Sequence, residues 1–417
     1  MRRAARLVSS LSSSPGLYGI PGLHEPAAFR VLAERAVVHG DGLVADVTRC
    51  TPGEGTVRAL DALSDSICCV VDAAELCRLT HPDPSWARAA EAAATTLHGY
   101  VAALNAHTGL YKAVCDALDT PALSREGRAV AASLRAEFER GGIALSSSGR
   151  ERLKAAQAEA LSCGFAYARA LSGPSRSQPA DAEEPLGDAS RADALLLRLL
   201  ASRAQAAALL GFPSYAHLAT QPLLAGSPEQ PEAFLAALSR GLRGRARAEA
   251  RAFAGAPDGG PPRERDARMA AARDAACGAA DRKAASAFFP LRNCVGGLLA
   301  LTRSLFGITL TPAVLAAHEA WDPGVSAFDA SHAGDGPLGR VYLDLGHRRG
   351  KPPGAAHFVI KAGFGGRGAA VALVARMGAG DDALSHSDVE TLHHEWGHAL
   401  HSLLSRTTYQ ARGLTRA

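Results

Sequence analysis

Apolar residues recur at steps of three and four through most of the first 335 residues of this chain, and that spacing is typical of amphipathic helices. The clearest case is Asp61–Thr80. The prolines at positions 82 and 84 should end this helix, because proline lacks an amide hydrogen and clashes with the preceding turn. The pattern predicts an N-terminal helical region, 16–171, and a second helical region, 192–335.

A segment rich in Gly, Pro and Ser joins the two regions at 172–191 and predicts a linker. The sequence changes character near Gly336, where short β-branched segments begin to alternate with Gly-rich turns. These segments predict three strands, at 340–345, 357–360 and 369–375, which lead into a further helix. The expected fold class is therefore mainly α, with a small β-sheet before that last helix.

The composition is that of an ordinary globular chain. Its 417 residues are 47% hydrophobic and 21% charged, enough to build a sizeable core. The net charge of +4 is spread along the chain and aromatic residues make up 5%, so a nucleic-acid-binding surface is not expected. No apolar run approaches the ~18 residues of a membrane span. The 8 cysteines show no C-x-x-C spacing, which favours reduced, mostly buried thiols over a disulfide framework.

The first residues of the chain are rich in Arg and Ser, and no acidic residue precedes Glu25. Arg2, Arg3 and Arg6 alternate with small apolar residues, and a serine-rich stretch follows. This pattern is typical of an organellar transit peptide, so we expect a transit segment at 1–15. The alternative is a disordered basic tail.

The expected helix after the strands carries the motif H-E-W-G-H at 394–398. Ser387 and Glu390 have the spacing of a capping box and predict where this helix begins. Apolar residues then follow at steps of three and four, so one face should be buried. The members of that face are Val389, Leu392, Trp396, Ala399 and Leu403.

The motif has the spacing of a zinc site. His394 and His398 are four residues apart, so their rings project from one side of the helix and can hold one zinc ion. Glu395 is rotated by about 100° and can act as general base on a zinc-bound water without ligating the metal. Gly397 leaves room for a neighbouring backbone. Chance would produce such a motif about 0.03 times in this chain, so a coincidental histidine pair is the weaker alternative.

A catalytic zinc site needs three protein ligands and an open position for water. A metzincin would supply a histidine six residues after His398, but that position is Leu404. His393 has no partner at four-residue spacing, and His401 either supports the ligands or is a surface or packed histidine. Glu390 is expected to serve the helix cap. The third ligand must therefore come from upstream or from outside these residues.

Segments spread along nearly the whole chain carry a family resemblance. They are G-L-Y-G-I-P-G-L at 16–23, D-A-L-S-D at 61–65, H-P-D-P at 81–84, L-G-F-P-S-Y at 210–215, G-R-V-Y-L-D-L at 339–345, H-E-W-G-H-A-L-H-S at 394–402 and R-T-T-Y-Q at 406–410. Together they resemble the thimet-type oligopeptidase family of zinc metallopeptidases, and in particular its mitochondrial intermediate peptidase branch. The segment at 394–402 is the most specific of them.

The resemblance implies a two-lobed helical shell around a deep channel, in which a strand beside the zinc helix pairs with the substrate backbone. It implies a zinc metalloendopeptidase that uses one Zn2+ ion, with His394 and His398 as ligands and Glu395 as the catalytic base. Residues 336–417 would then be part of the catalytic region. The implied substrates are unstructured peptides or precursor proteins, which lose a short N-terminal peptide. The implied location is the mitochondrial matrix, with the cytoplasm or another organelle as alternatives.

The resemblance has departures. The family's third ligand is a Glu beyond the segment at 415–416, and this sequence stops at Ala417, so we expect a chain that is incomplete at its C-terminus and has little peptidase activity as written. Arg376 stands where the family often has Asn. One alternative function is therefore a truncated, catalytically impaired protein that binds peptides or a partner. Another is a structural helical protein with a chance motif.

Overall fold

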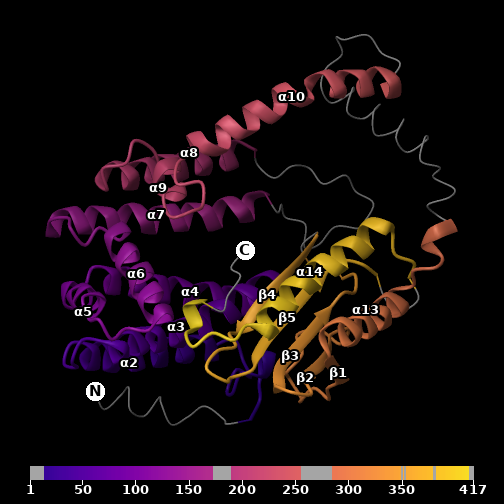
Figure 1. Cartoon of the computed structure of the whole chain (residues 1–417), viewed down its shortest axis with the longest axis horizontal. Coiled ribbons are helices and arrows are strands. Elements are labelled where there is room, and N and C mark those ends of the chain that lie inside the picture. Colours follow the sequence, from indigo (N-terminus) through magenta and orange to yellow (C-terminus); the bar gives the residue numbers. More distant parts are fainter. Residues whose placement is uncertain are drawn as a thin grey trace.

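The computed structural model describes residues 14–171, 189–254, 284–348, 351, 354–378 and 382–412. These residues form a mainly helical body with one five-stranded sheet, which confirms the expected fold class (Figure 1). Most of the expected transit segment and of the expected linker lies outside the described residues. None of the described helices is long and apolar enough to cross a membrane. The described cysteines are all free thiols.

The N-terminal region is helical, as its periodicity predicts. Its elements are η1 (Leu17–Gly19), α2 (Ala28–Val47), α3 (Glu54–Thr80), α4 (Pro84–Asn105), α5 (Thr108–Leu118), α6 (Arg125–Arg140) and α7 (Ser147–Leu171). Helix α3 ends at Thr80, before the two prolines. Asp83 then caps α4 by accepting a hydrogen bond from the Ser85 amide at 2.7 Å. The local sequence therefore fixes the turn between these two long helices.

Further helices follow the expected linker. They are α8 (Ala189–Leu209), α9 (Tyr215–Thr220), α10 (Glu229–Ala254) and α13 (Leu291–Phe306). Helices α7 and α8 pack against each other around a small cluster of Leu153, Ala156 and Ala206. Helix α10 extends away from the rest of the molecule in Figure 1, and its apolar side chains Phe234 and Leu235 are exposed.

The sheet has five strands where the sequence predicts three. They are β1 (Ile308–Pro312), β2 (Ser326–His332), β3 (Gly336–Asp344), β4 (Ala355–Lys361) and β5 (Ala369–Ala375), in the spatial order β1-β2-β3-β5-β4. Strands β3 and β5 are parallel, and the other neighbours are antiparallel. The expectation that 192–335 is helical is therefore wrong at β1 and β2. Both strands are short, and polar Asp329 and His332 interrupt the apolar pattern of β2.

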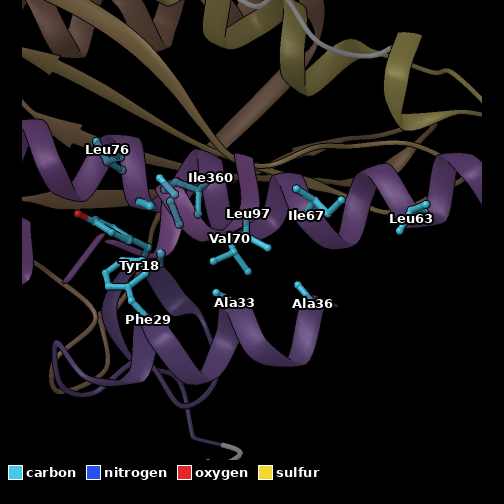
Figure 2. Packing of buried hydrophobic residues seen from close by; sticks show 14 of the residues in the cluster. Tyr18, Phe29, Ala33, Ala36, Leu63, Ile67, Val70, Leu76, Leu97 and Ile360 are labelled. Atoms are coloured by element: carbon cyan, nitrogen blue, oxygen red, sulfur yellow. The ribbon is translucent and has the colours of Figure 1, made fainter. Parts of the chain in front are cut away.

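The sheet separates two hydrophobic cores, one on each of its faces. Because successive side chains of a strand point to opposite faces, Tyr342 of β3 and Val374 of β5 pack with the N-terminal helices, while Val341 and Leu373 pack on the other side. Figure 2 shows Ile360 of β4 reaching into the core formed by α2, α3 and α4. Both faces of the central strands are therefore buried, and the sheet can hold a helix on each side.

The helix with the histidine motif, α14 (His386–Leu404), lies on the face of the sheet away from α3 (Figure 1). The chain that leaves it runs back to the N-terminal helices, where it forms η2 (Gln410–Arg412). The buried Asp61 of α3 accepts hydrogen bonds from the Gln410 amide at 2.8 Å and the Ala411 amide at 3.1 Å. The two layers of the molecule are thus tied together just beyond α14.

Candidate metal centre

The start of α14 is set by a capping box two residues earlier than predicted. Ser385 is the N-cap, and its hydroxyl donates to Asp388 Oδ2 at 2.7 Å, while the Asp388 amide donates to the Ser385 hydroxyl at 3.1 Å. The predicted box of Ser387 and Glu390 is therefore wrong. Ser385 and Asp388 have the same three-residue spacing as Ser387 and Glu390, and it is the earlier pair that forms the cap. Glu390 is exposed and lies 3.6 Å from His386 Nδ1.

The rotation of α14 about its axis is fixed by its apolar face. Leu392, Trp396, Ala399 and Leu403 are all buried, as the spacing predicts, and Val389 packs against the same core. The Trp396 indole N–H donates to Thr302 Oγ1 of α13 at 2.8 Å, which satisfies a donor that is otherwise surrounded by apolar groups.

Because this face is buried against the sheet and α13, the side of α14 that carries His394 and His398 turns outward. His394 is exposed, and His398 and Glu395 are half-buried.

The structure brings the two predicted ligands together. The Nε2 atoms of His394 and His398 are 3.3 Å apart, and the ring centroids are 5.0 Å apart with the planes at 79°. In a tetrahedral zinc site with Zn–N distances of about 2.0–2.1 Å, two ligand nitrogens are about 3.3–3.4 Å apart. The pair therefore has the nitrogen chemistry and the spacing that a single zinc ion requires.

A third histidine, which the sequence did not single out, lies beside this pair. His357 of β4 stacks on His398 with centroids 6.1 Å apart and planes at 29°, and its Nε2 is 3.3 Å from Ser402 Oγ. Burial above all, together with repulsion from the neighbouring His398 and His401, lowers the pKa of His357 to about 4. The one signal in the sequence is a histidine in a predicted strand, and the strand prediction alone does not tell which element that side chain meets.

A model of peptidase family M3 matches residues 183–416, which is more than half of the chain. The chain belongs to peptidase family M3. Relatives include the mitochondrial intermediate peptidase of Arabidopsis thaliana, 30% identical over 96% of this chain and 68% of that protein. The proteins of the same name from Homo sapiens and Mus musculus are 28% identical, over 95% and 97% of this chain. This M3 chain spans 63–68% of the length of these three relatives. The family resemblance drawn from the sequence is thus confirmed.

The M3 histidine pair has no third partner among the residues that the structure describes, where no group of three His, Cys, Asp or Glu side chains is placed to hold a metal ion. His393 is exposed, and its Nδ1 lies 2.8 Å from the Val389 carbonyl of its own helix. His401 is also exposed. The expected close approach of a backbone at Gly397 is not found in this part of the chain, since a Cβ there would meet no atom within 4 Å.

Strand β4 forms one edge of the sheet beside α14 in this M3 chain. Its inner edge pairs with β5 from Ala355 to Lys361, and no other strand of the described residues pairs with its outer edge. An unpaired strand edge presents a row of backbone donors and acceptors, which an extended peptide can use. The edge and the histidine pair are neighbours, because His357 of β4 stacks on His398.

Proposed function

We propose that this M3 chain is a zinc metalloendopeptidase that hydrolyses peptide bonds of unstructured peptides, with Glu395 as the general base. The observation that carries this proposal is the 3.3 Å separation of the Nε2 atoms of His394 and His398, next to Glu395 on the outward side of a fixed helix. Two nitrogens at that distance suit one metal ion, and a carboxylate beside them suits proton transfer.

His394 and His398 would hold the zinc ion. A bound zinc ion lowers the pKa of water towards ~7 and polarises a peptide carbonyl. Glu395 accepts a proton on its carboxylate from the attacking water, whose oxygen forms a bond to the carbonyl carbon. Glu395 then gives this proton to the amide nitrogen as the C–N bond breaks, so that a carboxylic acid and an amine leave the site.

The outer edge of β4 is the element that would orient the substrate. A peptide added to a sheet edge must be extended, and its backbone groups pair irrespective of its side chains. A folded protein cannot present such a segment, so the arrangement favours unstructured peptides. The two-lobed, channel-like shape that the family resemblance implies would favour the same substrates.

The cellular task that we propose is removal of short N-terminal peptides from precursors imported into the mitochondrial matrix. Support comes from the relatives named mitochondrial intermediate peptidase and from the Arg- and Ser-rich start of the chain. Residues 1–15 fused to a fluorescent protein should direct it to mitochondria, and replacing Arg2, Arg3 and Arg6 with Glu should abolish this. Fluorescence in the cytoplasm or another organelle with the native segment would contradict the proposed location.

Hydrolysis is tested with the purified protein and an unstructured peptide that carries a fluorophore and a quencher. We expect cleavage that a chelator stops and that zinc restores. Glu395→Gln should lower the rate by at least ~100-fold with the metal content unchanged, because the proton acceptor is lost and the histidines are not. Glu390→Gln is the matched control, an exposed glutamate of the same helix, and should cleave normally. Normal cleavage by Glu395→Gln would contradict the proposal.

A second candidate function is binding of peptides or of a partner without cleavage. It is favoured by the lack of a three-ligand group among the described residues, because much of the affinity of a zinc site comes from completing the coordination. In this case the same peptide should bind the protein, as measured by fluorescence anisotropy, and stay intact. Its affinity should then be the same with zinc, with chelator and in Glu395→Gln.

A further inference from the structure

We propose that His357 is a positioning residue for His398, which keeps the His398 ring turned so that its Nε2 faces the Nε2 of His394. This inference rests on the proposed function in one respect, that the histidine pair binds a metal ion. It concerns a residue on a different element from the motif, 41 positions before His398 in the sequence.

The alternation of side chains along β4 makes the His357 side chain point towards α14. Phe358 and Ile360 of the same strand pack with the N-terminal helices, so His357, which alternates with them, faces the opposite side of the sheet. It is opposite Leu373 of β5, which belongs to the core beneath α14. The place of His357 is therefore set by the sheet register and does not depend on α14 alone.

Two contacts join His357 to α14. Its Nε2 is 3.3 Å from the hydroxyl of Ser402, a residue that is 3% exposed and lies one turn after His398 on the same side of the helix. Its ring also stacks on His398, with planes at 29°. The hydrogen bond fixes the orientation of the His357 ring, and that ring stacks on His398 with the centroids 6.1 Å apart.

His398 is consequently confined on two sides. The His394 ring meets it nearly at a right angle, at 79°, and the His357 ring lies against its face. Rotation of the His398 ring about its bond to Cβ would disrupt its stacking with His357, which is held by Ser402 and by β4. A ligand whose ring is oriented before the metal arrives loses less conformational freedom on binding, and groups that orient ligands commonly contribute about 10-fold in metal affinity.

The experiment measures the affinity for Co2+, used as a spectroscopic probe in place of zinc, by its visible absorption and by calorimetry. His357→Ala should bind Co2+ about 10-fold more weakly than the wild type. Ser402→Ala should show a smaller loss, and the double variant should bind like His357→Ala, because Ser402 acts through His357. His393→Ala is the matched control, an exposed histidine of α14, and should bind normally.

Two further variants separate the effect of the hydrogen bond to Ser402 from that of the stacking on His398. They also provide a test in case His357→Ala does not fold. His357→Phe keeps a ring beside His398 but has no hydrogen-bonding group for Ser402. His357→Gln keeps a hydrogen-bonding partner for Ser402 but has no ring. We expect His357→Phe to bind more tightly than His357→Gln. Melting temperatures are recorded without metal, since a purely structural role would lower them and leave the Co2+ affinity unchanged.

Different Co2+ affinities are expected if only the role of His357 is wrong and if the metal site itself is wrong. If His394→Ala abolishes Co2+ binding while His357→Ala and Ser402→Ala bind like the wild type, His357 does not position His398, and the metal site stands. If the wild type binds Co2+ no better than His394→Ala, the metal site itself is wrong, and both proposals fall.

Discussion

The indole N–H of Trp396 donates a hydrogen bond to Thr302 Oγ1 at 2.8 Å, and this bond joins α14 to α13 inside the core beneath the histidine pair. Both residues are buried. The bond comes from the residue between Glu395 and Gly397, so it holds the helix at the turn that carries the two proposed metal ligands. The outward orientation of His394 and His398 therefore depends on contacts made on the opposite side of the helix.

This relationship predicts the effect of Thr302→Val. The change keeps the shape of the side chain but leaves the buried Trp396 N–H without an acceptor, which should lower the free energy of unfolding by about 1–3 kcal/mol. Chemical denaturation measures this value. Thr302→Ser keeps the hydroxyl and should lose clearly less than Thr302→Val. If Thr302→Val is as stable as the wild type, the hydrogen bond from Trp396 contributes nothing to stability.

A buried ionic cluster joins the sheet to the end of α3. Asp344 of β3 is 1% exposed and accepts hydrogen bonds from Lys351 Nζ at 2.8 Å, Arg348 Nη2 at 2.7 Å and Trp321 Nε1 at 2.7 Å. Arg348 also donates to the Thr80 carbonyl at 2.8 Å, across the interface between the layers. The carboxylate therefore balances two cations in a part of the molecule that water reaches poorly.

Asp344→Ala should consequently be strongly destabilising. It leaves Lys351 buried and charged without its carboxylate, and breaking a buried pair in this way costs about 3–5 kcal/mol. Asp46→Ala is the control, because Asp46 pairs with Arg49 on the exposed surface of α2, where an ion pair contributes about 0–1 kcal/mol. Urea denaturation compares the two variants. A loss for Asp344→Ala as small as that for Asp46→Ala would contradict the importance of the cluster.

The same cluster predicts how stability depends on pH. Burial alone would raise the pKa of Asp344, but hydrogen bonds from Arg348 and Lys351 outweigh burial and lower it below the usual value. An unfolded Asp has a pKa near ~3.9, so the unfolded chain takes up a proton first as the pH falls. The stability that Asp344 contributes should be fully present above about pH 4 and be lost as the pH falls towards the lower folded value.

Unfolding free energies measured from pH 6 to pH 2.5 check this dependence. The wild type should lose stability more steeply below about pH 4 than Asp344→Asn, which has no proton to gain at this position. Parallel curves for the two proteins would show that Asp344 does not have a lowered pKa.

The periodicity of the sequence predicts the buried side of α14 because that pattern is local. Leu392, Trp396, Ala399 and Leu403 recur at helical spacing, so their common face follows from one segment without reference to the rest of the chain. The outward position of His394 follows from the same spacing. The exact start of the helix does not, because two capping boxes overlap and the sequence does not say which one forms.

Other features depend on contacts between distant segments. Strand β1 pairs with β2, and β2 pairs with β3. The apolar alternation of β1 covers only five residues, and β2 has no clear alternation, so pairing is needed to stabilise both. His357 acquires its role only when the strand order puts β4 at the edge beside α14. Nothing within the segment around His357 distinguishes it from a histidine that faces the opposite core. A lone histidine in a strand is therefore uninformative until the topology is known.

The central claim is that His394 and His398 together hold one zinc ion. Equilibrium dialysis against zinc, followed by metal analysis, measures it directly. We predict one zinc ion per chain at saturation for the wild type and for His393→Ala, and loss of this ion in His394→Ala and in His398→Ala. Unchanged zinc content and affinity in both of these last variants would contradict the account.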